Sequence, residues 1–135
     1  MRRFAVIALC CASLFPAAAQ ASKTAILVDP PTFEVSAQAK PDQVKKGIKA
    51  AMLALHWTVD NERPGYVEGR YTGGRYWVRV AVSYVGHSVS IRYLTSDGLN
   101  FVEKADRRYI HANYNKWISA LVGAVPRSVE SSLNE

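Results

Sequence analysis

The sequence predicts a two-layer α+β sandwich, in which a four-stranded antiparallel meander carries two helices on one face. Residues 57–96 alternate apolar and polar side chains, which is the period of half-buried strands. Gly73-Gly74 and Gly86-His87 interrupt this alternation where tight turns would close hairpins. Apolar residues at helical spacing stand on either side of the stretch. The expected order is α-β-β-β-β-α, with or without a leading edge strand.

The first 21 residues predict export. Arg2 and Arg3 precede an apolar run over residues 4–15, and Pro16 and a cluster of small residues follow it. This order is typical of a cleaved secretory signal peptide, and we expect cleavage near Ala21. No later segment approaches the roughly 20 apolar residues that cross a bilayer. We therefore expect a periplasmic or secreted protein without a transmembrane segment.

Signal cleavage would remove both cysteines, Cys10 and Cys11. The mature chain would then have no disulfide and no thiolate ligand, so packing alone would have to stabilise it. A lipid-modified cysteine is the alternative interpretation, but Leu9 stands where such signals usually place a small residue.

The net charge of the mature chain narrows the classes of partner that we expect. The formal net charge of +6 includes Arg2 and Arg3, so cleavage leaves +4 (6 − 2). This modest excess favours acidic partners in a general way. We expect an envelope protein, an anionic lipid headgroup or a glycan, and export argues against nucleic acid. A solvated basic surface that only aids solubility is the alternative.

Residues 22–39 are expected to form an extended arm, and residues 40–135 a single domain. The two prolines at positions 30 and 31 favour extended backbone, and an edge strand is expected around residues 33–35. Pro41 suits the first turn of a helix. Apolar residues at helical spacing extend that helix to about Leu55, namely Val44, Ile48, Ala51, Met52 and Leu55.

The two turns also predict strand registers. A hairpin centred on Gly73-Gly74 places Tyr71 opposite Tyr76, and one centred on Gly86-His87 places Tyr84 opposite Val89. Both registers put the apolar side chains on the same face of the sheet. This agreement between independent turns is the main support for the meander.

An earlier strand over residues 57–60 is expected to pair with residues 66–72. Placing Trp57 and Val59 inward requires an odd-length loop or a bulge. The sheet is expected to end at Ser96-Asp97-Gly98.

The C-terminal third predicts one helix after an irregular connection over residues 99–108. Apolar residues recur at helical spacing from Ile110 to Val125, so the helix should begin near Tyr109 and run toward Gly123. Pro126 would either kink this helix or begin a final short turn.

The polar face of the meander is the candidate binding surface. The predicted registers gather three arginines and two aromatic residues there, namely Arg70, Arg79, Arg92, Trp77 and Tyr66. Such a face could bind an anion or a glycan, with Arg70 stacked on Trp77. The alternative is ordinary cross-strand pairing, with Glu68 bound to Arg79 and Arg70 covering Trp77.

Catalytic and cofactor signals are weak. The sequence contains no nucleophile elbow, no paired-carboxylate arrangement and no phosphate loop, and its histidines lack the spacing of a zinc motif. We therefore expect a non-enzymatic protein without a cofactor or a metal. A small hydrolase around His111, with Asp106 and a serine, is one alternative, in which Asn115 could orient the His111 ring.

A second alternative is a small-ligand binder with a cavity between the helices and the sheet. Four tyrosines on the inner face would line it, namely Tyr71, Tyr76, Tyr84 and Tyr93.

Several short sequence elements within residues 41–125 resemble those of a known group of proteins. They are His56-Trp57, Pro64-Gly65-Tyr66-Val67, Ser90-Ile91-Arg92-Tyr93, Ser96 with Leu99, Ile110-His111 and Tyr114-Asn115-Lys116-Trp117. Together they resemble a group of small exported proteins of Gram-negative bacteria, many of them known only as uncharacterised proteins or lipoproteins. The group usually has Gly where His56 stands, and often a lipid-anchor cysteine that is not found here. The resemblance implies a compartment and a fold but no activity. By fold analogy alone, the order of elements is also similar to the helix-grip domains of outer-membrane assembly accessory lipoproteins.

Overall fold

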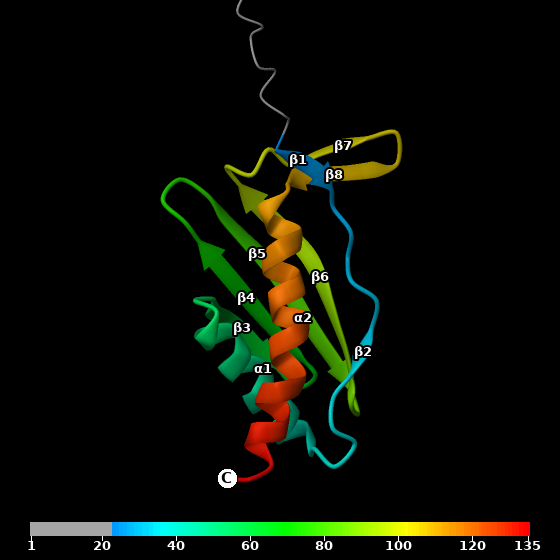
Figure 1. Cartoon of the computed structure of the whole chain (residues 1–135), viewed down its shortest axis with the longest axis vertical. Helices are drawn as coiled ribbons and strands as arrows, with labels where there is room; N and C mark the ends of the chain where they lie inside the picture. The colour runs from blue at the N-terminus through cyan, green and yellow to red at the C-terminus, as the bar shows by residue number, and fades with distance from the viewer. Residues whose placement is uncertain (1–22) are drawn as a thin grey trace, which may run out of the picture.

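Two helices and two antiparallel sheets form the computed structural model, which describes residues 23–135 (Figure 1). The expected signal segment and its cleavage position lie outside the described residues. In chain order the elements are β1 (Thr24–Ile26), β2 (Phe33–Glu34), α1 (Pro41–Ala54), β3 (Thr58–Arg63), β4 (Tyr66–Thr72), β5 (Trp77–Val85), β6 (Ser88–Asp97), β7 (Val102–Lys104), β8 (Arg107–His111) and α2 (Asn113–Ser132).

The larger sheet contains the predicted meander. Its strand order is β2-β6-β5-β4-β3, so the four consecutive strands β3 to β6 are neighbours and the short β2 adds an edge. The edge strand and the sheet end at Asp97 were both predicted. Buried side chains of β4, β5 and β6 line one face and meet both helices there, among them Val67, Val78, Val80, Val82, Val89 and Ile91.

The helices pack against each other as well as against the sheet. Gly47 of α1 makes this close approach possible, because a Cβ at Gly47 would lie 2.5 Å from Cγ2 of Val129 in α2. The start of α1 at Pro41 agrees with the prediction. The predicted start of the second helix near Tyr109 was wrong, since α2 begins at Asn113 and continues through Pro126 to Ser132.

A second sheet of three strands, in the order β1-β8-β7, replaces the irregular connection that was expected over residues 99–108. Ala25 of β1 faces Ile110 of β8, and Ile110 is fully buried. The strand partner lies at the other end of the chain, so the local apolar period of residues 109–111 could not separate a strand from a helix start. Asp29 ties the arm to both sheets, because its carboxylate accepts hydrogen bonds from the backbone N of Tyr93 and from Arg108.

One predicted register is confirmed and the other was wrong by two residues. Tyr84 faces Val89 as expected from Gly86-His87. Tyr71 faces Val78 instead of Tyr76, because residues 73–76 form a longer loop. The Tyr76 ring lies over Gly73, where a Cβ would come within 2.1 Å of it. A shift of two residues keeps every side chain on its predicted face.

Candidate functional site

The candidate site is the outer face of the five-stranded sheet, the face turned away from α1 and α2. Strand alternation and the observed registers place all five predicted residues there, namely Tyr66, Arg70, Trp77, Arg79 and Arg92. The two-residue shift changes their neighbours within the face. Arg79 lies directly opposite Arg70 instead of Glu68, and Arg92 lies opposite Ala81.

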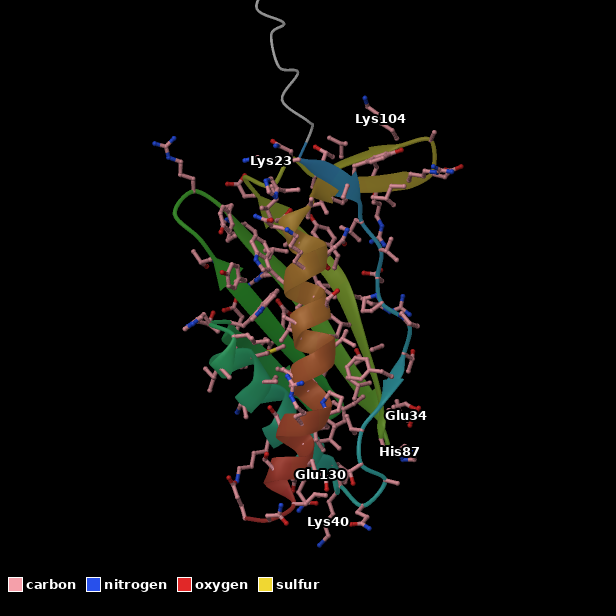
Figure 2. The ribbon with its side chains drawn as sticks, in the orientation of Figure 1. Lys23, Glu34, Lys40, His87, Lys104 and Glu130 are labelled. Carbon is pink, nitrogen blue, oxygen red and sulfur yellow. The ribbon has the colours of Figure 1, made fainter. Side chains whose placement is uncertain are left out.

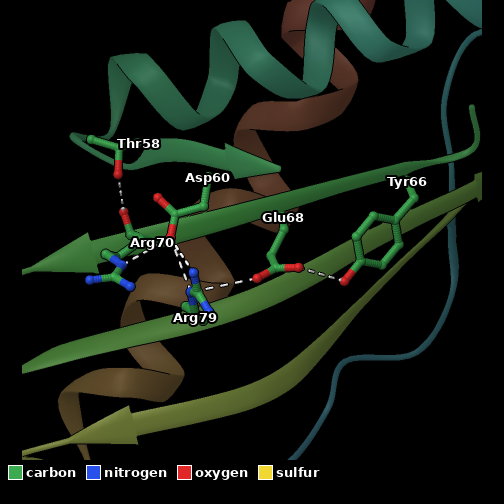
Figure 3. Close-up of polar contacts among 6 residues, drawn as sticks. All are labelled: Thr58, Asp60, Tyr66, Glu68, Arg70 and Arg79. Atoms are coloured by element: carbon green, nitrogen blue, oxygen red, sulfur yellow. Dashed lines mark hydrogen bonds and ion pairs between the residues drawn. The ribbon is translucent and has the colours of Figure 1, made fainter. Parts of the chain in front are cut away.

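A β-bulge places a carboxylate between the two facing arginines. The β3–β4 register steps from Val59 opposite Gly69 to Asn61 opposite Glu68, which leaves Asp60 as the extra residue. Oδ2 of Asp60 accepts hydrogen bonds from Nε of Arg70 at 2.9 Å and from Nε of Arg79 at 3.0 Å (Figure 3).

These bonds determine how Asp60 titrates. Burial alone would raise the pKa of Asp60, but the hydrogen bonds from Arg79 and Arg70 outweigh it and hold the pKa below its ordinary value. The carboxylate is therefore charged at neutral pH. It offsets the repulsion of two guanidinium groups that face each other across β4 and β5.

The network continues through Glu68 to Tyr66. Oε1 of Glu68 lies 3.5 Å from Nε of Arg79, and its Oε2 accepts a hydrogen bond of 3.0 Å from the Tyr66 hydroxyl (Figure 3). Burial, reinforced by this bond to the Glu68 carboxylate, raises the pKa of Tyr66. Polar contacts thus link Arg70, Asp60, Arg79, Glu68 and Tyr66 across three strands.

Guanidinium groups cover the two aromatic rings of the outer face. The Arg70 guanidinium carbon lies 4.8 Å from the centroid of the Trp77 ring, so the expected stacking is present. Arg63, which lies opposite Tyr66, places its guanidinium carbon 3.8 Å from the Tyr66 centroid. Both rings are consequently held in place by a charged neighbour.

Arg92 stands apart from the network. Its side chain is exposed and forms no ion pair with any residue in the described range 23–135. The structure therefore brings four of the five predicted residues into one connected cluster and leaves Arg92 as a separate positive charge on the same face.

Asp60 and Arg63 are the members of the site that the sequence prediction did not include. The signal for Asp60 was present, because turning both Trp57 and Val59 inward required a bulge or an odd-length loop. Trp57 is indeed buried and Val59 packs against the core, and the bulge lies between them and Asn61.

The inner-face tyrosines are packed against other rings. The Tyr71 ring centroid lies 4.7 Å from that of Trp117, and the Tyr76 centroid lies 5.4 Å from the same ring. Tyr93 stacks on Phe101 at 4.7 Å. These rings occupy the space between helices and sheet that a ligand would need.

His111 lies at the end of β8, where its Nδ1 accepts a hydrogen bond from the backbone N of Asn113. The Asn115 amide donates to the carbonyl of Ile26 and not to His111. Asp106 lies in the turn at the opposite end of β8, about 16 Å away at the usual rise of a strand. Within the described part of the chain, no three His, Cys, Asp or Glu side chains cluster to hold a metal ion.

Fold and site together define the class of this protein: an α+β domain that covers one face of an antiparallel sheet with helices and exposes a charged, aromatic network on the other. No family model, curated protein or solved structure matches the chain. Membership in the group of exported proteins that it resembles therefore stays a prediction. No helix in residues 23–135 is long and apolar enough to span a membrane.

Proposed function

We propose that the chain is an exported, non-enzymatic binding module that recognises another envelope protein through the outer face. The observation that carries the proposal is the bulge carboxylate of Asp60, which fixes Arg70 and Arg79 beside Trp77. Arg, Trp and Tyr are the residue types that dominate binding energy at protein interfaces. A face that holds all three in fixed positions loses little side-chain entropy on binding.

The charge balance of the network supports a protein over the other two partner classes. Arg70 and Arg79 are already paired with Asp60 and Glu68, which weakens their attraction for an isolated anionic headgroup. Guanidinium groups cover the Trp77 and Tyr66 rings, which leaves their faces less available for stacking on a sugar. Fixed donors and acceptors side by side suit a polar protein surface instead.

The test is photo-crosslinking in the cell envelope. A photoreactive residue at position 77 should trap a protein. A second probe at Ser83, on the same face, keeps the test valid if replacing Trp77 weakens binding. A probe at the exposed Ala120 of α2 serves as the control position.

The arginines provide the matched variants. Arg70→Ser, Arg79→Ser and Arg92→Ser combined should reduce the adduct about tenfold or more, because truncated interface hot spots each cost at least this much. Lys116→Ser with Arg127→Ser on α2 should leave the adduct unchanged. The proposal fails if both probes trap only lipid or glycan, if neither traps anything, or if the triple variant crosslinks like the parent.

A further inference from the structure

A second exposed surface lies on the three-stranded sheet at one end of the molecule. We define the end face as the side chains of Ile26, Val102, Lys104, Arg107 and Tyr109. Ile26 faces Tyr109 and Tyr109 faces Val102 across β1, β8 and β7, while Lys104 faces Arg107. Tyr109 and Arg107 are two residues apart on β8, so these two rows share one side of the sheet.

The end face points away from the body of the protein. The other side of the same sheet carries the fully buried Ile110, and Leu27, just after β1, is also buried in the core. Arg108 also lies on that inner side, where it binds Asp29. Figure 1 shows the β7–β8 hairpin projecting at this end, and Figure 2 shows Lys104 directed away from the ribbon.

An apolar row crosses the end face. Ile26 is 44% exposed and Val102 is 43% exposed, and the half-buried Tyr109 lies between them. Two exposed aliphatic side chains and a tyrosine in one row form a surface that gains free energy when it leaves water. Tyrosine is also enriched where one end of a ring is apolar and the other is wet.

The two charged side chains of the end face are both positive, while Glu103 faces Arg108 on the inner side and Asp106 lies in the turn of the hairpin. Lys104 and Arg107 lie directly opposite each other, an arrangement that is destabilising for like charges. Neither forms an ion pair with another residue of the described chain, and none of the five end-face residues is acidic. Arg70 and Arg79 have the same facing arrangement on the outer face, but Asp60 lies between them.

The lysines of α1 offer a further contrast. Lys46 is bound to Glu135 and Lys49 to Glu62, so two cations of that basic helix face are neutralised within the chain. The end face therefore combines exposed apolar side chains with two cations that form no ion pair within the described residues.

We infer that the end face docks on the surface of an anionic lipid bilayer. In this arrangement Lys104 and Arg107 approach the headgroup phosphates, which relieves their mutual repulsion. Ile26 and Val102 enter the boundary between headgroups and acyl chains, and Tyr109 lies at the level of the headgroups. The outer face belongs to a different sheet, so this inference does not depend on the proposed protein partner.

The experiment is flotation of the purified protein with lipid vesicles. Vesicles of phosphatidylethanolamine and phosphatidylcholine are compared with vesicles that also contain phosphatidylglycerol. We expect the protein to float only with the anionic vesicles, and less so at high salt. Lys104→Ser with Arg107→Ser should lower the partition coefficient about thirtyfold, because each cation near an anionic surface contributes about fivefold.

Matched variants test whether vesicle binding depends on the end face itself or only on the total charge and apolar surface of the protein. Lys45→Ser with Lys46→Ser removes two cations from α1 and should float like the parent. Ile26→Ser with Val102→Ser should bind more weakly, whereas serine at Leu53 and Val85, which are even more exposed, should have no effect. The inference is overturned if the parent ignores anionic vesicles, or if the α1 and end-face variants lose binding equally. All substituted side chains are at least partly exposed, and thermal unfolding of each variant checks that it folds.

Discussion

Asp60 and Arg79 lie nineteen residues apart in the sequence, yet a hydrogen bond of 3.0 Å joins their side chains on the outer face. The contact exists because β3 contains one residue more than its partner at this point. Without the bulge, Asp60 would still point outward, since Val59 points inward, but it would lie directly opposite Glu68 in the place that Asn61 takes. One inserted residue thus connects two strands that are not neighbours in the sheet.

Asp60→Asn is expected to lower the free energy of unfolding by about 0.5–1 kcal/mol at neutral pH, because the pairs are only partly shielded from solvent. The folded-state pKa of Asp60 is lowered from the reference value of 3.8. Its contribution is therefore fully present above pH 3.8 and is lost as the pH falls through the folded-state pKa. Urea unfolding of parent and variant at neutral and strongly acidic pH should show the difference shrinking. Asp97→Asn, at an exposed position of β6, should have almost no effect.

His56→Gly is expected to stabilise the protein by about 1 kcal/mol. His56 follows the C-cap of α1 with a φ of 66°, a left-handed conformation that glycine adopts without strain. The melting temperature is the measurement. His56→Ala is the control, because it keeps the Cβ and should bring no gain; equal stabilisation by Ala would contradict the backbone explanation.

Two helical glycines should respond in opposite directions to alanine. Gly47→Ala forces a Cβ against the backbone of Val129 and should cost roughly 2 kcal/mol or more. A Cβ at Gly123 would have no neighbour within 4 Å, so Gly123→Ala should stabilise α2 by up to about 1 kcal/mol. Denaturant midpoints of the two variants give the comparison. A similar change at both positions would show that the helix contact at Gly47 is looser than described.

Tyr114→Phe is expected to stabilise the fold by about 1 kcal/mol, because it removes a buried hydroxyl that has no hydrogen-bond partner among the described residues. Burial raises the pKa of Tyr114, so the hydroxyl is neutral throughout the stable pH range. Tyr93→Phe is the counterpart and should cost about 1 kcal/mol, since the Tyr93 hydroxyl lies 2.7 Å from Oγ of Ser96. Thermal unfolding should place the two variants on opposite sides of the parent.

The meander and α1 could be predicted because their signals are local. Glycine at 86 takes a φ of 59°, which suits a two-residue turn, so the register of β5 and β6 followed from the sequence as far as Val80 and Tyr93. Beyond that pair a bulge shifts the register by one residue, so Arg79 faces Thr95. The turn at Gly73-Gly74 is longer because the Tyr76 ring turns back over Gly73 and stacks on Trp117. That ring contact comes from α2 and leaves no trace in the residues next to the turn.

The faces of the candidate site could be predicted, but its contacts could not. A register error of two residues leaves each side chain on the face of the sheet that was predicted for it, so the five expected side chains still share the outer face. The same error placed Glu68 directly opposite Arg79, whereas in the structure Arg70 lies opposite Arg79. The position of Asp60 depends on a bulge whose exact place is determined by the packing of Trp57 and Val59, which is a property of the folded core.

The pairing of β1 with β8 has a consequence for the order in which the chain folds. Thr24 faces His111, so the first described strand waits for a partner 87 residues away (111 − 24). Closing so long a loop carries a large entropic cost, and it cannot begin until most of the polypeptide has been synthesised. The strand β1 therefore stays without its partner until β8 has been synthesised, so the three-stranded sheet is completed only after the meander and α1 have left the ribosome.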